Sequence, residues 1–150
     1  MKKTIFITLC LLSMVSVPTA RTEPQPQSEA IRFAPLHVYI DSDQAPLAAY
    51  QFELKTLAGH VEIVGVEGGE HPAYRHAPYY DPAALANDRI IIASYSTDTD
   101  LPDGLTRIAT LHLQITGDIE PEYELELTVA ADADGRRTPA EIMYEKGETE

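Results

Sequence analysis

Two stretches of sequence decide the fold: residues 107–116 read RIATLHLQIT, and residues 122–130 read EYELELTVA. Apolar and polar residues alternate in both, and this period of two is typical of a β-strand with one buried face. In the first stretch we expect Ala109, Leu111, Leu113 and Ile115 to point inward, and Ile108, Thr110, His112 and Gln114 to point outward. In the second we expect Tyr123, Leu125, Leu127 and Val129 to point inward, and Glu122, Glu124, Glu126 and Thr128 outward.

Similar runs occur elsewhere in the chain, at residues 36–40, 48–57, 61–66, 89–95 and 141–144. In the run 48–57, Tyr50, Phe52 and Leu54 share one side. Residues 90–92 are three consecutive isoleucines, which favours a strand covered on both faces. Six or seven strands in about 110 residues is the number expected of a sandwich. The sequence therefore predicts an all-β fold, a two-sheet antiparallel β-sandwich of jelly-roll or immunoglobulin-like type.

The first twenty residues have the layout of a secretory signal peptide. Lys2 and Lys3 are followed by an apolar run at residues 5–17 and by small residues at 18–20. We expect cleavage after Ala20, a flexible leader at residues 21–33, the sandwich at 34–144 and a tail at 145–150. No other apolar run approaches the length of a spanning helix, so we expect no transmembrane anchor in the mature chain. The protein is then exported, either to a periplasm or to the outside of the cell.

Charge and cysteine content narrow the function classes. The chain has 150 residues with 24 acidic and 11 basic ones, and loss of Lys2 and Lys3 leaves a net charge near −15. Such a surface repels phosphate, so we expect neither nucleic acid nor anionic lipid as a partner. The single cysteine, Cys10, lies in the expected signal peptide. Leu9 precedes it at a position where a lipidation motif has a small residue, so we expect no lipid anchor. Removal of the signal peptide also removes the cysteine, so we expect the mature sandwich to have no disulfide.

Two groups of residues are candidates for partner binding. The long connection at residues 68–88 (GGEHPAYRHAPYYDPAALAND) contains Tyr74, Tyr79 and Tyr80, and tyrosine offers a large contact area with a polar tip. The alternative is a rigid flap whose tyrosines pack over an open end of the sandwich. The second group is the outward row of the first stretch, which carries little charge: Ile108, Thr110, His112 and Gln114. Equally, this row could lie beneath the long connection.

No residue pattern predicts a metal site, a cofactor or a catalytic centre. His71 and His76 are separated by five positions that include a proline, which matches no standard ligand spacing. The acidic clusters at residues 98–103 and 132–135 lack the pattern of an EF-hand, and Asp134-Gly135 is typical of a hairpin turn. Carboxylates are abundant, but a sandwich of this length has little room for the cleft that a glycosidase needs. We therefore expect a protein that is not an enzyme.

The order of these strands resembles bacterial cohesin domains. The similar segments are LAAYQFELKTLAGHVEIVGVEGG at residues 47–69, RIIIASYST at 89–97 and TRIATLHLQITG at 106–117. The resemblance implies a cohesin-like sandwich related to carbohydrate-binding modules, which is not an enzyme and binds dockerin modules in extracellular polysaccharide-degrading assemblies. The chain departs from a typical cohesin in being shorter and in having no scaffold linker, which puts the partner in doubt. Two alternatives therefore stand beside it: a carbohydrate-binding module that uses the tyrosine-rich connection, and a structural envelope protein that associates with itself through an edge strand.

Overall fold

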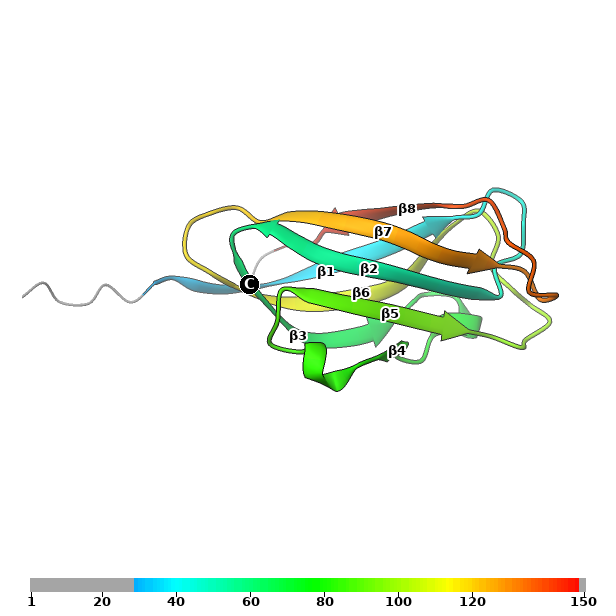
Figure 1. Cartoon of the computed structure of the whole chain (residues 1–150), viewed down its shortest axis with the longest axis horizontal. Coiled ribbons are helices and arrows are strands. Elements are labelled where there is room, and N and C mark those ends of the chain that lie inside the picture. Colours follow the sequence, from blue (N-terminus) through cyan, green and yellow to red (C-terminus); the bar gives the residue numbers. More distant parts are fainter. Residues whose placement is uncertain (1–28, 149–150) are drawn as a thin grey trace, which may run out of the picture.

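The computed structural model describes residues 29–148, and these residues form a sandwich of two four-stranded antiparallel sheets (Figure 1). Sheet A has the order β3-β6-β1-β8 and sheet B the order β4-β5-β2-β7. The strands are β1 (Ile31–Asp41), β2 (Ala49–Ala58), β3 (His60–Gly68), β4 (Tyr79–Tyr80), β5 (Arg89–Tyr95), β6 (Leu105–Thr116), β7 (Glu122–Ala131) and β8 (Glu141–Lys146). The predicted all-β, two-sheet antiparallel sandwich is confirmed.

A single apolar core fills the space between the sheets. Tyr50, Phe52 and Leu54 of β2 are buried as predicted, and they face Leu111 and Leu113 of β6. Alternate residues of a strand point to opposite faces, so each strand contributes one row to this core and one row to solvent. Burying both inner faces against each other is what stabilises sheets of this size, because a single pleated layer would leave its apolar row in water.

Two β-bulges reverse the expected alternation within β6 and β7. The pairing of β1 with β6 passes over Ile108, so Ile108 turns inward and is fully buried. The pairing of β2 with β7 passes over Thr128, so Val129 points outward and is exposed while Ala130 is buried. The expected outward position of Ile108 and inward position of Val129 are therefore wrong. An extra residue in one strand changes the phase of a period of two, and all residues beyond it change face.

The isoleucine run in β5 has one buried face instead of two. Ile90 and Ile92 belong to the core, but the side chain of Ile91 is 47% exposed on the outer face of sheet B. The prediction of a strand covered on both faces is wrong because residues 29–148 form only two layers. β-branched residues also suit a half-buried strand, so their presence did not distinguish the two cases.

The ends of the sandwich extend beyond the expected domain bounds. β1 begins at Ile31, inside the segment expected to be a leader, because Ile31 pairs with Thr116 of β6. β8 continues to Lys146, two residues into the expected tail. The expected signal peptide at residues 1–20 and most of the leader lie outside the described residues. Within residues 29–148, no helix is long and apolar enough to cross a membrane.

The long connection after β3 folds against the sheets. It contains two single-turn 3₁₀ helices, η1 (Pro72–Tyr74) and η2 (Pro82–Ala84), with β4 between them. Its last residues hydrogen-bond to the edge of β3, where the Ala86 amide donates to the Ile63 carbonyl and the Ile63 amide donates to the Asn87 carbonyl. The connection thus covers an edge that would otherwise expose unpaired backbone groups.

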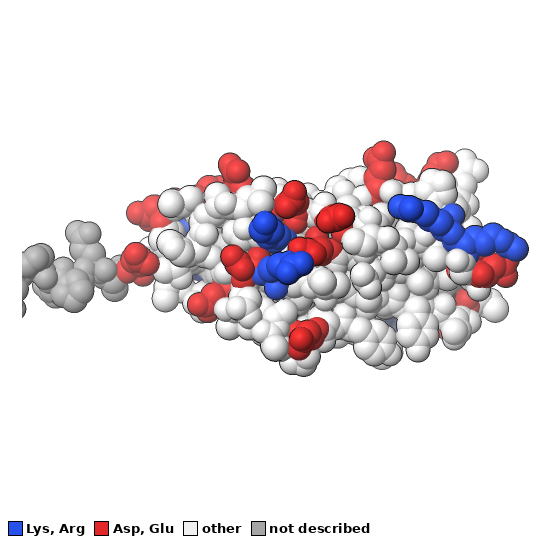
Figure 2. All heavy atoms as spheres, in the orientation of Figure 1, with Lys and Arg blue, Asp and Glu red and all other residues white. Residues whose placement is uncertain are grey.

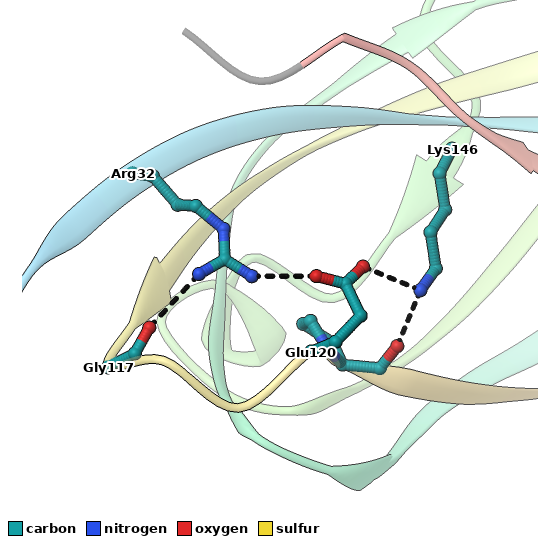
Figure 3. Close-up of polar contacts among 5 residues, drawn as sticks. Arg32, Gly117, Glu120 and Lys146 are labelled. Atoms are coloured by element: carbon teal, nitrogen blue, oxygen red, sulfur yellow. Dashed lines mark hydrogen bonds and ion pairs between the residues drawn. The ribbon is translucent and has the colours of Figure 1, made fainter.

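A polar cluster ties β8 to the loop between β6 and β7 (Figure 3). Arg32 donates hydrogen bonds to the Gly117 carbonyl (3.0 Å) and to the Glu120 carboxylate (2.9 Å). Lys146 reaches the same carboxylate from the other side (2.8 Å) and donates to the Pro121 carbonyl (2.7 Å). Beside this cluster, the ring of Tyr144 in β8 meets the ring of Tyr123 in β7 edge to face. The cluster therefore joins the edge strands of the two sheets at one end of the sandwich.

Candidate functional site

Tyr74 is a core residue and is not accessible to a partner. Its side chain is 2% exposed and its ring lies edge-on against Tyr50, with 5.0 Å between the ring centroids. Its hydroxyl donates a hydrogen bond to the Leu47 carbonyl at 2.7 Å, and burial raises the pKa of Tyr74 above its ordinary value. A tyrosine that fills the core and satisfies a buried carbonyl anchors the connection to the sandwich. This outcome matches the alternative of a rigid flap.

The expected outward row of β6 is largely unavailable as well. Ile108 is in the core, and Thr110 is only 2% exposed. The Thr110 hydroxyl accepts a hydrogen bond from Arg107 (2.7 Å) and lies 3.0 Å from Nδ1 of His37, so two side chains cover it. Thr110 therefore serves the packing of the outer side of sheet A.

His112 and Gln114 are the members of this row that remain partly exposed, on the outer face of sheet A. Nε2 of His112 lies 3.1 Å from a carboxylate oxygen of Glu67. An open hollow of about 240 Å³ lies beside the histidine, lined by Phe33, Ala34, Pro35, His112, Leu113 and Glu148. Carboxylates adjoin this surface, so it offers a partner a smaller uncharged area than its sequence suggested.

Tyr79 and Tyr80 take different positions although they are adjacent in β4. Tyr80 is half-buried against the core, whereas Tyr79 is 66% exposed on the outer face of sheet B. His112 and Gln114 lie on the outer face of the other sheet, across the full thickness of the sandwich. The predicted partner-binding residues therefore do not form one site. Tyr79 is the large hydrophobic residue of the connection that is exposed to a partner.

Tyr79 belongs to an apolar surface that the sequence did not reveal. Its ring stacks on that of Tyr95 in β5, with 6.1 Å between the centroids and 9° between the planes, and Tyr95 is 63% exposed. Strand register places further residues of β5, β2 and β7 on the same outer face. We call this surface the aromatic face; its members are Tyr79, Tyr95, Ile91, Gln51 and Val129.

The aromatic face lies between two charged areas (Figure 2). On one side are the Glu53–Arg89 ion pair (2.6 Å) and the carboxylates of Glu124 and Glu126. Figure 2 shows a mixed group of acidic and basic side chains on the face of the molecule turned to the viewer. Arg89 holds the pKa of Glu53 below its usual range. On the other side, beyond the end of β7, is Arg137, which forms no ion pair with any residue between 29 and 148. The surface between them is uncharged in a strongly acidic protein.

Three loop residues with side chains capable of binding a metal have structural roles. His71 accepts a hydrogen bond from the Ala73 amide and so caps η1, and Asp81 does the same for η2. Asp132 accepts from the amides of Asp134 and Arg136 in the turn after β7. Over the described part of the chain, no group of three or more His, Cys, Asp or Glu side chains is placed to hold a metal ion.

The sequence alone could not identify the aromatic face, because its residues become neighbours only through the register between strands. Tyr95 is two residues from Ala93 and four from Ile91, so the three share one side of a strand. Val129 reaches this side only because of the bulge at Thr128. Comparison of the chain with family models, with curated proteins and with solved structures gave no match. The resemblance to cohesins therefore remains a prediction, and the aromatic face is the strongest candidate site.

Proposed function

We propose that this protein is an exported, non-catalytic binding module, cohesin-like in fold, that recognises a protein partner of the dockerin type through the aromatic face. Its setting would be an extracytoplasmic, polysaccharide-degrading assembly. The observation that supports this proposal is the exposure of Tyr79 and Tyr95 beside the uncharged residues Gln51 and Val129, in a chain with 24 acidic residues.

The composition of this surface suits a protein partner. Tyrosine and arginine are enriched among residues that dominate protein–protein binding energy, and charged residues are depleted at the centre of interfaces. The aromatic face has two tyrosines at one side and is bordered by Arg137 at the other, with small or uncharged residues between them. A partner docking here would displace water from apolar side chains without stripping it from carboxylates, which would be costly.

Capture from the secreted fraction of the source organism tests the proposal. Immobilised protein should enrich proteins with paired calcium-loop repeats, and Tyr79→Ala/Tyr95→Ala should lose this capture. Phe33→Ala is the matched control, because Phe33 is also an exposed aromatic residue (49%) but lies in β1, on sheet A. Capture that persists in the tyrosine double variant, or that disappears equally in the control, would show that the aromatic face is not the docking site.

A carbohydrate is the second candidate ligand, and the near-parallel rings of Tyr79 and Tyr95 favour it. The apolar face of a sugar ring stacks on exposed aromatic rings, because the positive C–H groups meet the negative face of the π-system. Affinity electrophoresis in gels that contain soluble neutral polysaccharides tests this candidate. Retardation of the wild-type protein that is lost in Tyr79→Ala/Tyr95→Ala would favour it over the protein partner.

A further inference from the structure

The register of sheet B divides its outer face into three rows that cross the strands. The central row consists of Tyr79, Ala93, Gln51 and Val129. The arginine row consists of Tyr95, Ala49, Ala131 and Arg137. The glutamate row consists of Ile91, Glu53 and Glu126. Along β2 each neighbouring row is two residues away, or roughly 6.6 Å at the rise of a β-strand.

These rows make the aromatic face, together with the charged residues that border it, complementary to itself, and we infer that two copies of this chain associate through it. The two-fold axis would lie in the interface and run along the central row, so that the arginine row of each copy faces the glutamate row of the other. In such an isologous contact, every pair of residues occurs twice. The inference uses the same surface as the proposed function, but it does not require that a dockerin-type partner binds there.

The apolar residues pair well under this symmetry. Tyr79 and Val129 lie on the axis row, so each meets its own counterpart in the second copy. Tyr95 of the arginine row and Ile91 of the glutamate row both lie in β5, so each Tyr95 meets an Ile91 of the other copy. All four of these side chains are between 42% and 66% exposed, and the contact would remove them from water together.

The charges pair under the same operation. Arg137 follows the end of β7 and Glu126 lies within β7, so both occupy the same margin of the sheet. The two-fold axis brings Arg137 of each copy to Glu126 of the other, and both lack an ion pair with any described residue of their own chain. Glu53, the other carboxylate of the glutamate row, is already paired with Arg89. Elsewhere the acidic surfaces of two copies repel each other, so electrostatics favours this face over the rest of the molecule.

The size of the face predicts a weak dimer. Four strands about 4.8 Å apart and six residues at about 3.3 Å each cover roughly 300–400 Å² per copy. A stable interface buries about 800 Å² per partner, so this one belongs to the weak, concentration-dependent class. The dimer would therefore cover the aromatic face at high protein concentration, and a tighter partner would replace the second copy.

Sedimentation velocity of the purified protein, from micromolar to near-millimolar concentration at low salt, tests the inference. The wild-type sedimentation coefficient should rise with concentration, and Tyr79→Ala/Tyr95→Ala should remain monomeric. Arg137→Glu places the new carboxylate opposite Glu126 of the other copy in both symmetry-related contacts at the β7 margin, and it should weaken association about tenfold or more. Arg137→Glu/Glu126→Arg restores opposite charges and should recover the dimer, while Phe33→Ala should behave as wild type.

Crosslinking gives a second measure, because it traps a weak dimer covalently and reports which residues lie at the contact. The only cysteine is Cys10, in the expected signal peptide, so Gln51→Cys introduces a single thiol on the axis row. Facing sheets are about 10 Å apart, and a thiol-reactive linker of that length should join two Gln51→Cys chains but not two Glu62→Cys chains, whose thiols lie on sheet A. A wild-type protein that stays monomeric throughout, or a dimer that survives both the tyrosine and the arginine variants, would overturn the inference. Partner capture by a monomeric protein would still support the proposed function.

Discussion

Tyr74 and Tyr79 stand five residues apart in one connection, yet one fills the core and the other is among the most exposed apolar residues of the molecule. The difference lies in what each residue touches. The Tyr74 ring packs on Tyr50 and its hydroxyl satisfies the Leu47 carbonyl, whereas Tyr79 stacks only on the exposed ring of Tyr95. At the scale of single residues, tyrosine therefore serves stability at one position and offers a binding surface at the other.

The Tyr74 hydroxyl provides a stability test at this scale. Tyr74→Phe keeps the ring but leaves the buried Leu47 carbonyl without this donor, which should lower the free energy of unfolding by about 1–3 kcal/mol. Tyr79→Phe removes an exposed hydroxyl and should change it by less than about 0.5 kcal/mol. Urea unfolding followed by circular dichroism measures both. Equal effects of the two substitutions would contradict the role assigned to Tyr74.

Glycines at the end of β3 allow a second test by substitution. A Cβ atom at Gly69 would clash with the backbone carbonyl oxygen of Arg107, whereas at Gly65 it would meet only the His112 side chain at 3.7 Å. Gly69→Ala should therefore force the backbones apart and cost about 1–3 kcal/mol or more, while Gly65→Ala should be tolerated. Thermal unfolding midpoints of the two variants distinguish them, and a stable Gly69→Ala protein would argue against this close approach.

At the scale of elements, β8 is held by its pairing with β1 and by contacts of its last residue. Among the described strands it pairs with β1 alone, and Lys146 joins the cluster at Glu120. The hydrogen bonds and charges of Lys146, with those of Arg32, hold the pKa of Glu120 below its usual range. Nearby, burial raises the pKa of Tyr123 to about 12. The edge strand is thus held by an acid–base cluster whose strength depends on pH.

The lowered pKa of Glu120 predicts the direction of this pH dependence. The folded state binds a proton at Glu120 less readily than the unfolded chain does, so the stabilisation is present above the ordinary glutamate pKa of 4.5 and is lost as the pH falls through the lowered value. Hydrogen exchange of the β8 amides should therefore accelerate relative to the β6 amides in acid. Glu120→Gln should show the faster β8 exchange already at neutral pH. If β8 exchange in the variant matched wild type at pH 7, the cluster would not hold the strand.

At the scale of the whole molecule, both sheets share one core, so a substitution at its centre should destabilise both sheets together. Leu111 of β6 is fully buried between the sheets, whereas Leu105 of the same strand is 57% exposed. Leu111→Ala should lower the free energy of unfolding by about 2–5 kcal/mol, and Leu105→Ala by far less. The transitions followed by far-ultraviolet circular dichroism and by tyrosine fluorescence should coincide in both variants. Separate transitions would show that the sheets unfold independently.

Most of the fold could be predicted from the sequence, because period two is a local property. The alternation of Tyr50, Phe52 and Leu54 already implied a strand with one buried face, and several such strands in one short chain implied two stacked sheets. The same reasoning failed at Ile108 and Val129, which change face at bulges. A bulge is a mismatch between two paired strands, so no single strand's sequence defines it.

The candidate site separates more clearly what the sequence determines from what only the tertiary structure determines. The sequence by itself determined the all-β class, the strands and an acidic chain with an unusual tyrosine-rich connection. Only the tertiary structure decided that Tyr74 is internal, that Tyr79 meets Tyr95, and that Arg137 shares a row with Tyr95. The physical reason is that a surface is assembled across strands that are distant in sequence. The register of backbone hydrogen bonds between those strands, and not the order of residues within any of them, determines which side chains become neighbours.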